Sequence, residues 1–172
     1  MAKPHKTPAK QASCGRPGDE TTGVRRILLV EDSKMHQLVA LRMLDMIGHR
    51  ADADAVADGN AAIALLANRK YDLILMDCEM PDLDGYQTTA LIRRLERASQ
   101  RPGTPIVGLG AAAGHDVRAA VESGMDDELT KPLRIEDLQR AIERWLGAVD
   151  IRDKVTATTF AVRDGSAALD AG

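Results

Sequence analysis

Four acidic residues and one lysine stand where they could handle a phosphoryl group: Glu31, Asp32, Asp77, Glu79 and Lys131. Glu31 and Asp32 follow one short apolar run, and Asp77 follows a second. Clustered carboxylate oxygens suit a hard cation such as Mg²⁺. A carboxylate can also attack phosphorus and form an aspartyl phosphate, while lysine supplies a compact positive charge for phosphoryl oxygens. Together these residues predict metal-assisted phosphoryl chemistry.

Each of these signals also has an ordinary structural explanation. An acidic pair after a strand often only caps the next helix, and a single Asp at a strand end serves capping as readily as function. Lys131 followed by Pro132 is, by itself, typical of a loop. The functional interpretation is favoured because all of these residues occur together, each after an expected strand.

The elements that would position these residues are indicated by apolar periodicity between residues 25 and 147. Runs of strand length occupy residues 26–30, 51–57, 71–76, 105–109 and 128–130. Helical spacing occupies residues 35–47, 61–68, 87–98, 116–123 and 135–146. This alternation predicts βαβ units and an α/β fold with a parallel sheet. Sites in such sheets form beyond the carboxyl ends of the strands, where the acidic residues and Lys131 fall.

The same pattern predicts several local features. Gly48 is expected to end the first helix, and Asn60 to cap the second. On the third helix, Leu91, Ile92 and Leu95 are expected to face the core. Because the strands lack polar alternation, we expect them to be buried on both faces. The methionines of the first helix are also expected to pack against the rest of the protein: Met35, Met43 and Met46.

Composition excludes several classes of protein. The 172 residues are enough for one domain, and fractions of 44% hydrophobic and 28% charged residues are ordinary for a soluble protein. A net charge of −3 gives no overall basic field for nucleic acid. No apolar run approaches the roughly 18 residues of a membrane helix, and none follows the N-terminus as in a signal peptide. The cysteines and histidines form no metal or redox pattern, so we expect a cytoplasmic protein: Cys14, Cys78, His36, His49 and His115.

Three segments are expected along the chain. Residues 25–147 form the folded domain. Residues 1–24 contain Lys, Pro, Gly, Ser and Thr with almost no bulky apolar side chain, which predicts a disordered N-terminal tail. Residues 148–172 are rich in Ala and Thr and are expected to form a flexible C-terminal tail, with a short strand over residues 155–162 as the alternative.

Three runs of sequence carry a family resemblance: ILLVED at 27–32, DLILMDCEMPDLDG at 72–85 and TKP at 130–132. In order, spacing and loop sequence, they resemble the receiver domain of two-component response regulators over residues 25–146. The resemblance implies a flavodoxin-like (βα)5 fold, which is a doubly wound parallel sheet with strand order 2-1-3-4-5.

The resemblance also implies a role for each site residue. Asp77 would accept a phosphoryl group from the phosphohistidine of a histidine kinase or a histidine-phosphotransfer domain. Glu31 and Asp32 would hold Mg²⁺, directly or through water, with Asp77 and the backbone carbonyl of Glu79. Lys131 would pair with the phosphoryl group. Such a module is not an enzyme, because it catalyses at most its own phosphorylation and dephosphorylation, and it acts through protein contacts or by passing phosphate on.

Residues 76–81 (MDCEMP) and 124–127 (GMDD) are more similar to receivers that belong to or serve hybrid histidine kinases. Those receivers usually exchange phosphate with a histidine-phosphotransfer domain. The chain is then either a stand-alone receiver or a fragment of a hybrid kinase. About 25 residues after the last helix are too few for a DNA-binding domain, so no direct contact with nucleic acid is expected.

Two positions depart from the family pattern. Gly110 stands where the family usually has Thr or Ser, whose hydroxyl bonds the phosphoryl oxygen in the active state, and residues 111–114 (AAAG) offer no substitute hydroxyl. Glu128 stands where the family usually has an aromatic switch residue, and we expect its carboxylate to be exposed. The lost charge-assisted hydrogen bond is worth roughly 1.5–3 kcal/mol. We therefore expect the chemistry at Asp77 to survive better than the switch does.

Two other functions compete with a phosphoacceptor. A pseudo-receiver that binds partners without phosphorylation is favoured by Gly110 and Glu128, but a scaffold has no need of the acidic residues and Lys131. A Mg²⁺-dependent phosphatase of the haloacid-dehalogenase type also uses an Asp nucleophile after a strand. That family needs a second Asp two residues later, where this chain has Glu79, and its motif lies on the first strand.

Overall fold

A computed structural model describes residues 25–49, 53–111 and 117–147, and its central feature is a five-stranded parallel sheet. The strands are β1 (Ile27–Val30), β2 (Ala53–Val56), β3 (Leu73–Asp77), β4 (Ile106–Ala111) and β5 (Asp127–Lys131). Their order across the sheet is β2-β1-β3-β4-β5, and every neighbouring pair is parallel. The predicted flavodoxin-like α/β fold, with strand order 2-1-3-4-5, is therefore confirmed.

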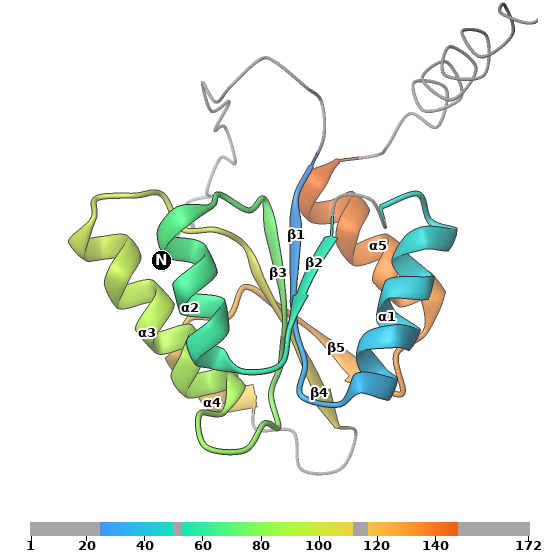
Figure 1. The fold of residues 1–172 in the computed structure, drawn as a ribbon, viewed down its shortest axis with the longest axis horizontal. Helices are drawn as coiled ribbons and strands as arrows, with labels where there is room; N and C mark the ends of the chain where they lie inside the picture. Colours follow the sequence, from blue (N-terminus) through green and yellow to red (C-terminus); the bar gives the residue numbers. More distant parts are fainter. Residues whose placement is uncertain (1–24, 50–52, 112–116, 148–172) are drawn as a thin grey trace, which may run out of the picture.

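In the described part of the chain, five helices connect or follow the strands: α1 (Lys34–Met46), α2 (Gly59–Asn68), α3 (Gly85–Ala98), α4 (Val117–Ser123) and α5 (Ile135–Leu146). Figure 1 shows α1 and α5 on one face of the sheet and α2, α3 and α4 on the other. This two-sided covering makes the sheet doubly wound. Because every neighbouring pair of strands is parallel, the carboxyl ends of all five strands lie at the lower edge of the molecule in that view.

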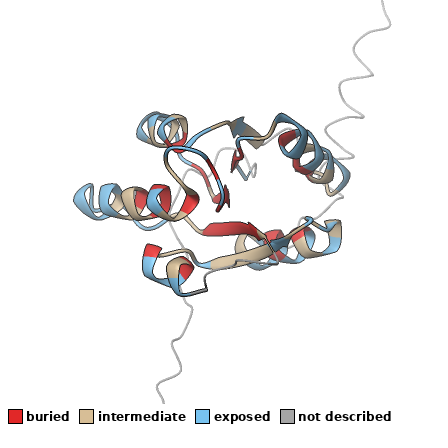
Figure 2. Ribbon diagram, turned by 90° about the horizontal axis from the view of Figure 1, so that it is seen from below, coloured by how far each residue is buried: buried red, intermediate tan, exposed pale blue. Residues whose placement is uncertain are grey.

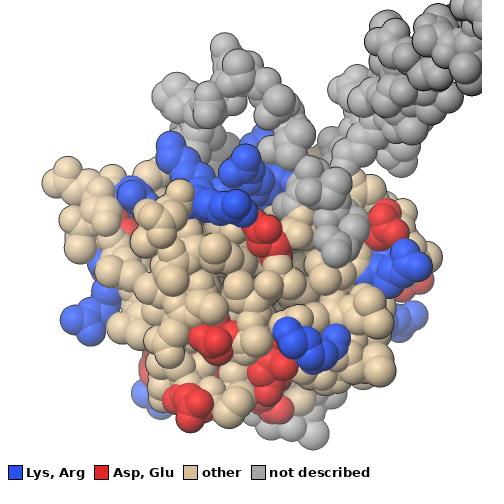
Figure 3. Space-filling view, in the orientation of Figure 1, with Lys and Arg blue, Asp and Glu red and all other residues tan. Residues whose placement is uncertain are grey.

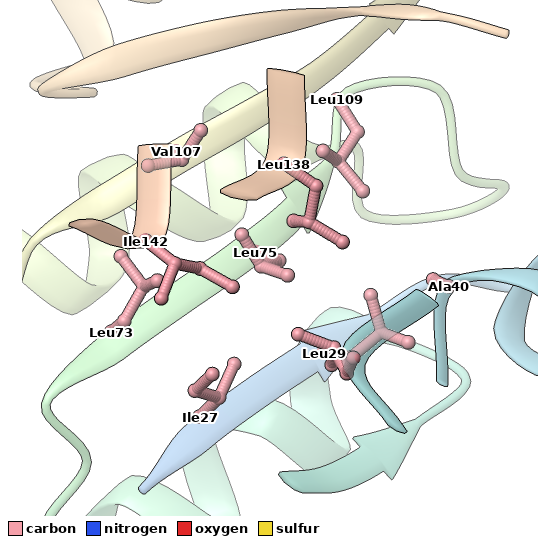
Figure 4. Close-up of a cluster of buried hydrophobic side chains, with 10 residues drawn as sticks. Ile27, Leu29, Ala40, Leu73, Leu75, Val107, Leu109, Leu138 and Ile142 are labelled. Carbon is pink, nitrogen blue, oxygen red and sulfur yellow. The ribbon is translucent and has the colours of Figure 1, made fainter. Parts of the chain in front are cut away.

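The core lies on both faces of the central strands. Every residue of β1 and β3 is buried, as Figure 2 illustrates for the middle of the sheet. Between the sheet and α1 and α5, ten buried side chains form one cluster, which includes Leu29, Leu75 and Leu138 (Figure 4). Full burial of such a side chain contributes roughly 1.5–3 kcal/mol. The edge strands β2 and β5 are only partly buried, so the expectation of burial on both faces is wrong for them.

The ends of the first two helices are set by local hydrogen bonds. Gly48 ends α1 as predicted, with a φ of 83° that favours glycine and a backbone N–H that donates to the carbonyl of Asp45. The side chain of Asp58 caps α2 by accepting from the backbone N–H of Ala61 at 2.8 Å. The prediction that Asn60 caps α2 is wrong, because the helix starts two residues earlier than predicted and Asn60 lies in its first turn.

Three apolar side chains that were expected to face the core are exposed. Leu95 on α3 is 51% exposed, while Ile92 is buried as predicted. Met35 and Met46 on α1 are 67% and 76% exposed, although Met43 does pack against the core. Together with Leu38 and Val39, the exposed Met35 and Met46 form an apolar stripe on the outer surface of α1.

Several sequence predictions concern residues outside the described ranges. These are the N-terminal and C-terminal tails, the first two residues of the expected second strand, and residue 116 at the start of the expected fourth helix. Within the described residues, no helix is long and apolar enough to cross a membrane.

Candidate functional site

The predicted site residues lie at the carboxyl ends of three strands. Glu31 and Asp32 directly follow β1, Asp77 is the last residue of β3, and Lys131 is the last residue of β5. Strands β1 and β3 are neighbours in the sheet, which brings the two acidic segments together. Most acidic side chains visible in Figure 3 lie in the lower half of the molecule, toward this edge, while Lys and Arg gather along the upper edge.

Lys131 joins the two acidic segments. Its Nζ lies 2.8 Å from Oε2 of Glu31 and 2.8 Å from Oδ1 of Asp77. Both carboxylate side chains are only 2% exposed, and the lysine side chain is 23% exposed. One ammonium therefore faces two buried carboxylates, an arrangement that leaves excess negative charge in a poorly solvated place.

This geometry shifts the pKa values of both Asp77 and Lys131. Burial raises the pKa of Asp77 above its usual range and Glu31 adds repulsion, against the opposing hydrogen bonds from Lys131 and the amide of Glu79. Burial tends to lower the pKa of Lys131, but its hydrogen bonds to Asp77 and Glu31 prevail and raise that pKa. Lys131 thus stays a cation beside a carboxyl whose negative charge still lacks full compensation.

The two carboxylate oxygens of Asp77 differ in their hydrogen-bond partners. The backbone N–H of Glu79 donates to Oδ1 at 3.1 Å, and Lys131 contacts the same oxygen. Among the described residues, no donor contacts Oδ2. The side chain is therefore held at Oδ1, and Oδ2 is the oxygen without a donor among the described residues.

Three carboxylates form a group that fits a divalent cation. Single oxygens of Glu31, Asp32 and Asp77 lie within 4.8 Å of one another. Glu31 and Asp77 are buried, and Asp32 is exposed. With Lys131 the group carries a net charge of −2, which one Mg²⁺ would neutralise, and all three ligands are oxygens as Mg²⁺ prefers. Glu79 is exposed and reaches Asp77 through its amide, whereas a role for its carbonyl stays a prediction.

Gly85, at the start of α3, packs closely against the backbone of Asp77. A Cβ atom at this position would lie 2.0 Å from the backbone carbonyl oxygen of Asp77, and the Gly85 N–H donates to the carbonyl of Cys78. Helix α3 begins here because Asp84 caps it, so α3 starts two residues earlier than predicted. The sequence showed Gly85 only as part of a family motif, and the contact supplies the physical reason for glycine.

His36, which was not expected to belong to a site, contacts Glu31. Its Nδ1 lies 3.1 Å from Oε1 of Glu31. The residue lies on the first turn of α1, and its backbone N–H donates to the cap residue Ser33. A single histidine five residues after a strand-end acid carries no recognisable spacing pattern, so the sequence could not indicate this contact.

Gly110 and Glu128, the two positions predicted to depart from the family pattern, lie on the neighbouring strands β4 and β5. Gly110 pairs with Thr130, and Glu128 pairs with Gly108. Glu128 is half-buried, so the expectation of an exposed carboxylate there is wrong. Its Cγ would lie 3.6 Å from a Cβ placed on Gly108, a position already crowded by Sδ of Met125 at 2.8 Å and Sγ of Cys78 at 3.2 Å. The stem of the Glu128 side chain therefore lies against β4, and the residue is only partly open to solvent.

Comparison with known proteins identifies the family. The sequence matches the response regulator receiver domain over residues 27–143. It is 40% identical over 134 residues to the sensor histidine kinase GacS of Pseudomonas protegens, covering 75% of this chain and 14% of that kinase. The chain therefore belongs to the response regulator receiver domain family, of the type found in hybrid kinases. It spans only a small part of the length of that relative.

Solved receiver structures agree with the fold. The receiver domain of the sensor histidine kinase PA1611 from Pseudomonas aeruginosa is 41% identical, with a TM-score of 0.62 over 72% of this chain and 98% of that domain. That structure has a magnesium ion coordinated in its active-site cleft. The co-crystal of the Saccharomyces cerevisiae phosphotransfer protein Ypd1 with the receiver domain of Ssk1 matches at 28% identity and a TM-score of 0.63, over 74% of this chain and 94% of the matched chain.

Proposed function

We propose that the chain is a phosphoacceptor receiver, phosphorylated on Asp77 by a histidine kinase or a histidine-phosphotransfer domain in the presence of Mg²⁺. The observation that carries this proposal is the geometry of Asp77. Lys131 and a backbone amide hold Oδ1, and Oδ2 has no donor among the described residues. A carboxylate with one oxygen fixed and one open is suited to nucleophilic attack on phosphorus.

The transfer can be written on this chain's own atoms. Oδ2 of Asp77 attacks the phosphorus of a donor phosphohistidine, an O–P bond forms, and the P–N bond breaks with its electron pair returning to the donor imidazole. Lys131, placed 2.8 Å from Asp77, pairs with an oxygen of the transferred group. Glu31 and Asp32, with Asp77, would hold Mg²⁺, which neutralises charge on the phosphoryl oxygens when bound.

The apolar stripe on α1 is the proposed docking surface for the phosphotransfer partner. Four exposed side chains at helical spacing form it: Met35, Leu38, Val39 and Met46. The stripe begins three residues after Asp32, so a helical partner laid along α1 would hold its histidine beside the acidic edge. The complex of Ypd1 with a receiver domain supports a partner of this class.

The direct test of the proposal is labelling by a small phosphoryl donor. Acetyl phosphate with Mg²⁺ should add one phosphoryl group to the unmodified protein, visible in its intact mass and lost in acid, as expected for an acyl phosphate. Omitting Mg²⁺ should remove the adduct. A protein that gains no mass under either condition would contradict a phosphoacceptor and favour a pseudo-receiver.

Mg²⁺ affinity should depend unequally on the two acids after β1. We expect Asp32→Asn to weaken Mg²⁺ binding more than Glu31→Gln, because Asp32 is exposed while both oxygens of Glu31 already accept hydrogen bonds. Titration of amide chemical shifts measures both affinities. Glu122→Gln, on the exposed surface of α4, is the control and should bind as the unmodified protein does. Unchanged binding in both acid variants would remove Glu31 and Asp32 from the cation site.

The replaced switch residues favour the second candidate, a partner-binding pseudo-receiver. Gly110 has no hydroxyl to follow a phosphoryl oxygen, and Glu128 is a half-buried acid in place of an aromatic ring. Moving that acid inward beside a phosphorylated Asp77 would cost desolvation and like-charge repulsion. The same residues are compatible with a phosphoacceptor whose response stays local, such as a member of a phosphate relay, and labelling separates the two candidates.

Phosphorylation should therefore perturb the structure locally. Beryllofluoride, as a phosphoryl mimic, should shift amide resonances near Asp77 strongly and those of α4, β5 and α5 only weakly, because a ligand that favours neither state shifts no equilibrium. Gly110→Thr should restore part of the distant response, and Gly110→Thr with Glu128→Tyr should restore more. Large shifts across α4, β5 and α5 in the unmodified protein would refute this decoupling.

A further inference from the structure

Glu31 has hydrogen-bond donors on both of its oxygens although its side chain is only 2% exposed. Lys131 donates to Oε2 at 2.8 Å, and the backbone N–H of Ser33 donates to Oε1 at 3.2 Å. Nδ1 of His36 lies 3.1 Å from the same Oε1. Because that nitrogen faces a carboxylate oxygen, it carries a hydrogen and donates. Oε1 therefore accepts two hydrogen bonds at once.

We propose that His36 is a positioning residue that occupies Oε1 of Glu31 and so keeps Glu31 from binding the cation directly. The inference rests on the proposed function, since it concerns the Mg²⁺ that accompanies phosphorylation of Asp77. An oxygen with both lone pairs in use, and with donor hydrogens pointed at it, is a poor metal ligand. Glu31 is then left to act through water, and direct contacts fall to Asp32 and Asp77.

The position of His36 makes this contact a built part of the site. The residue sits on the first turn of α1, where Ser33 caps the helix and accepts from the His36 backbone N–H at 3.4 Å. The helix start thus fixes the backbone from which the ring reaches back to Glu31. The ring itself is 58% exposed, so substitutions here leave the core intact.

Two substitutions of His36 distinguish the effect of its N–H donor from the effect of its side-chain size. His36→Asn keeps an N–H close to the position of Nδ1, whereas His36→Leu keeps the size and removes the donor. Outer-shell partners change metal affinity by about 10–100-fold when they support a ligand. Because His36 restrains Glu31 instead, we expect His36→Leu to tighten Mg²⁺ binding about three- to tenfold and His36→Asn to leave it within about twofold. Amide chemical shifts titrated with MgCl₂ give the dissociation constants.

A double-mutant cycle tests whether the effect passes through Glu31. In a Glu31→Gln background, His36→Leu should leave the Mg²⁺ affinity unchanged, because the carboxylate it acts on is gone. Equal or weaker Mg²⁺ binding by the His36→Leu variant would overturn the role of His36 and leave the proposed function standing. A protein that binds no Mg²⁺ before any substitution would overturn the proposed function together with this inference.

Discussion

Asp77→Asn is expected to reduce acetyl phosphate labelling to background while the protein stays folded. The amide is nearly isosteric with the carboxylate, but its uncharged oxygen does not attack phosphorus. The substitution also removes a buried acid that Glu31 repels, and Lys131 keeps its 2.8 Å contact with Glu31. We therefore expect a complete loss of the adduct in the intact mass, with circular dichroism and the denaturation midpoint close to those of the unmodified protein.

Asp82→Asn is the matched control for this experiment. Asp82 lies in the same loop after β3, is exposed, and has a φ of 64°, a conformation that Asn adopts as readily as Asp. The control should label as fully as the unmodified protein. An adduct that persists in Asp77→Asn would move the phosphoacceptor to another carboxylate, and loss of the adduct in Asp82→Asn would make the loop, and not Asp77 alone, responsible.

Much of the fold could be predicted because its central strands leave a strong signal. β1 and β3 are buried along their whole length, and continuous apolar runs marked both. Their order in the sheet came from the family resemblance, since periodicity carries no information on which strands are neighbours. Helix surfaces were harder to predict. Leu95 and Met35 have apolar side chains at helical spacing yet are exposed, because hydrophobicity alone does not say which side of a helix meets the sheet.

In the site, too, the sequence indicated which residues follow the strands but not which side chains contact one another. The sequence placed Asp77 and Lys131 at strand ends, and the parallel sheet brings them within 2.8 Å of each other although they are far apart in the chain. It could not indicate that His36 reaches Glu31, since that contact depends on the angle at which α1 leaves β1. Nor could it give the orientation of Glu128, which depends on the small residue opposite it on β4.

Gly85→Ala is expected to destabilise the fold and to displace Asp77 at the same time. The added Cβ would lie 2.0 Å from the carbonyl oxygen of Asp77 and 2.9 Å from the Cα of Cys78. Both are backbone atoms, so no side-chain rotation relieves the overlap, and either α3 or the end of β3 must move. Overpacking typically costs about 1–3 kcal/mol, and we expect about 3 kcal/mol or more here because backbone is displaced. Urea denaturation measures the loss, and acetyl phosphate labelling should slow in parallel.

Gly103→Ala is the matched control, because it adds the same methyl group at a position where only side-chain atoms have to move. Its Cβ would meet only the ends of the Arg93 and Glu96 side chains, at 3.3 Å, and such atoms can move by a few tenths of an ångström. We expect a change within about 1 kcal/mol, since alanine also reduces the entropy of the unfolded chain, and unaltered labelling. If Gly85→Ala matched this control in both measurements, the contact with Asp77 would not position the acceptor. If Gly85→Ala loses stability and labelling while Gly103→Ala does not, the contact of Gly85 with the carbonyl of Asp77 holds Asp77 in place. This contact is what distinguishes the two glycines.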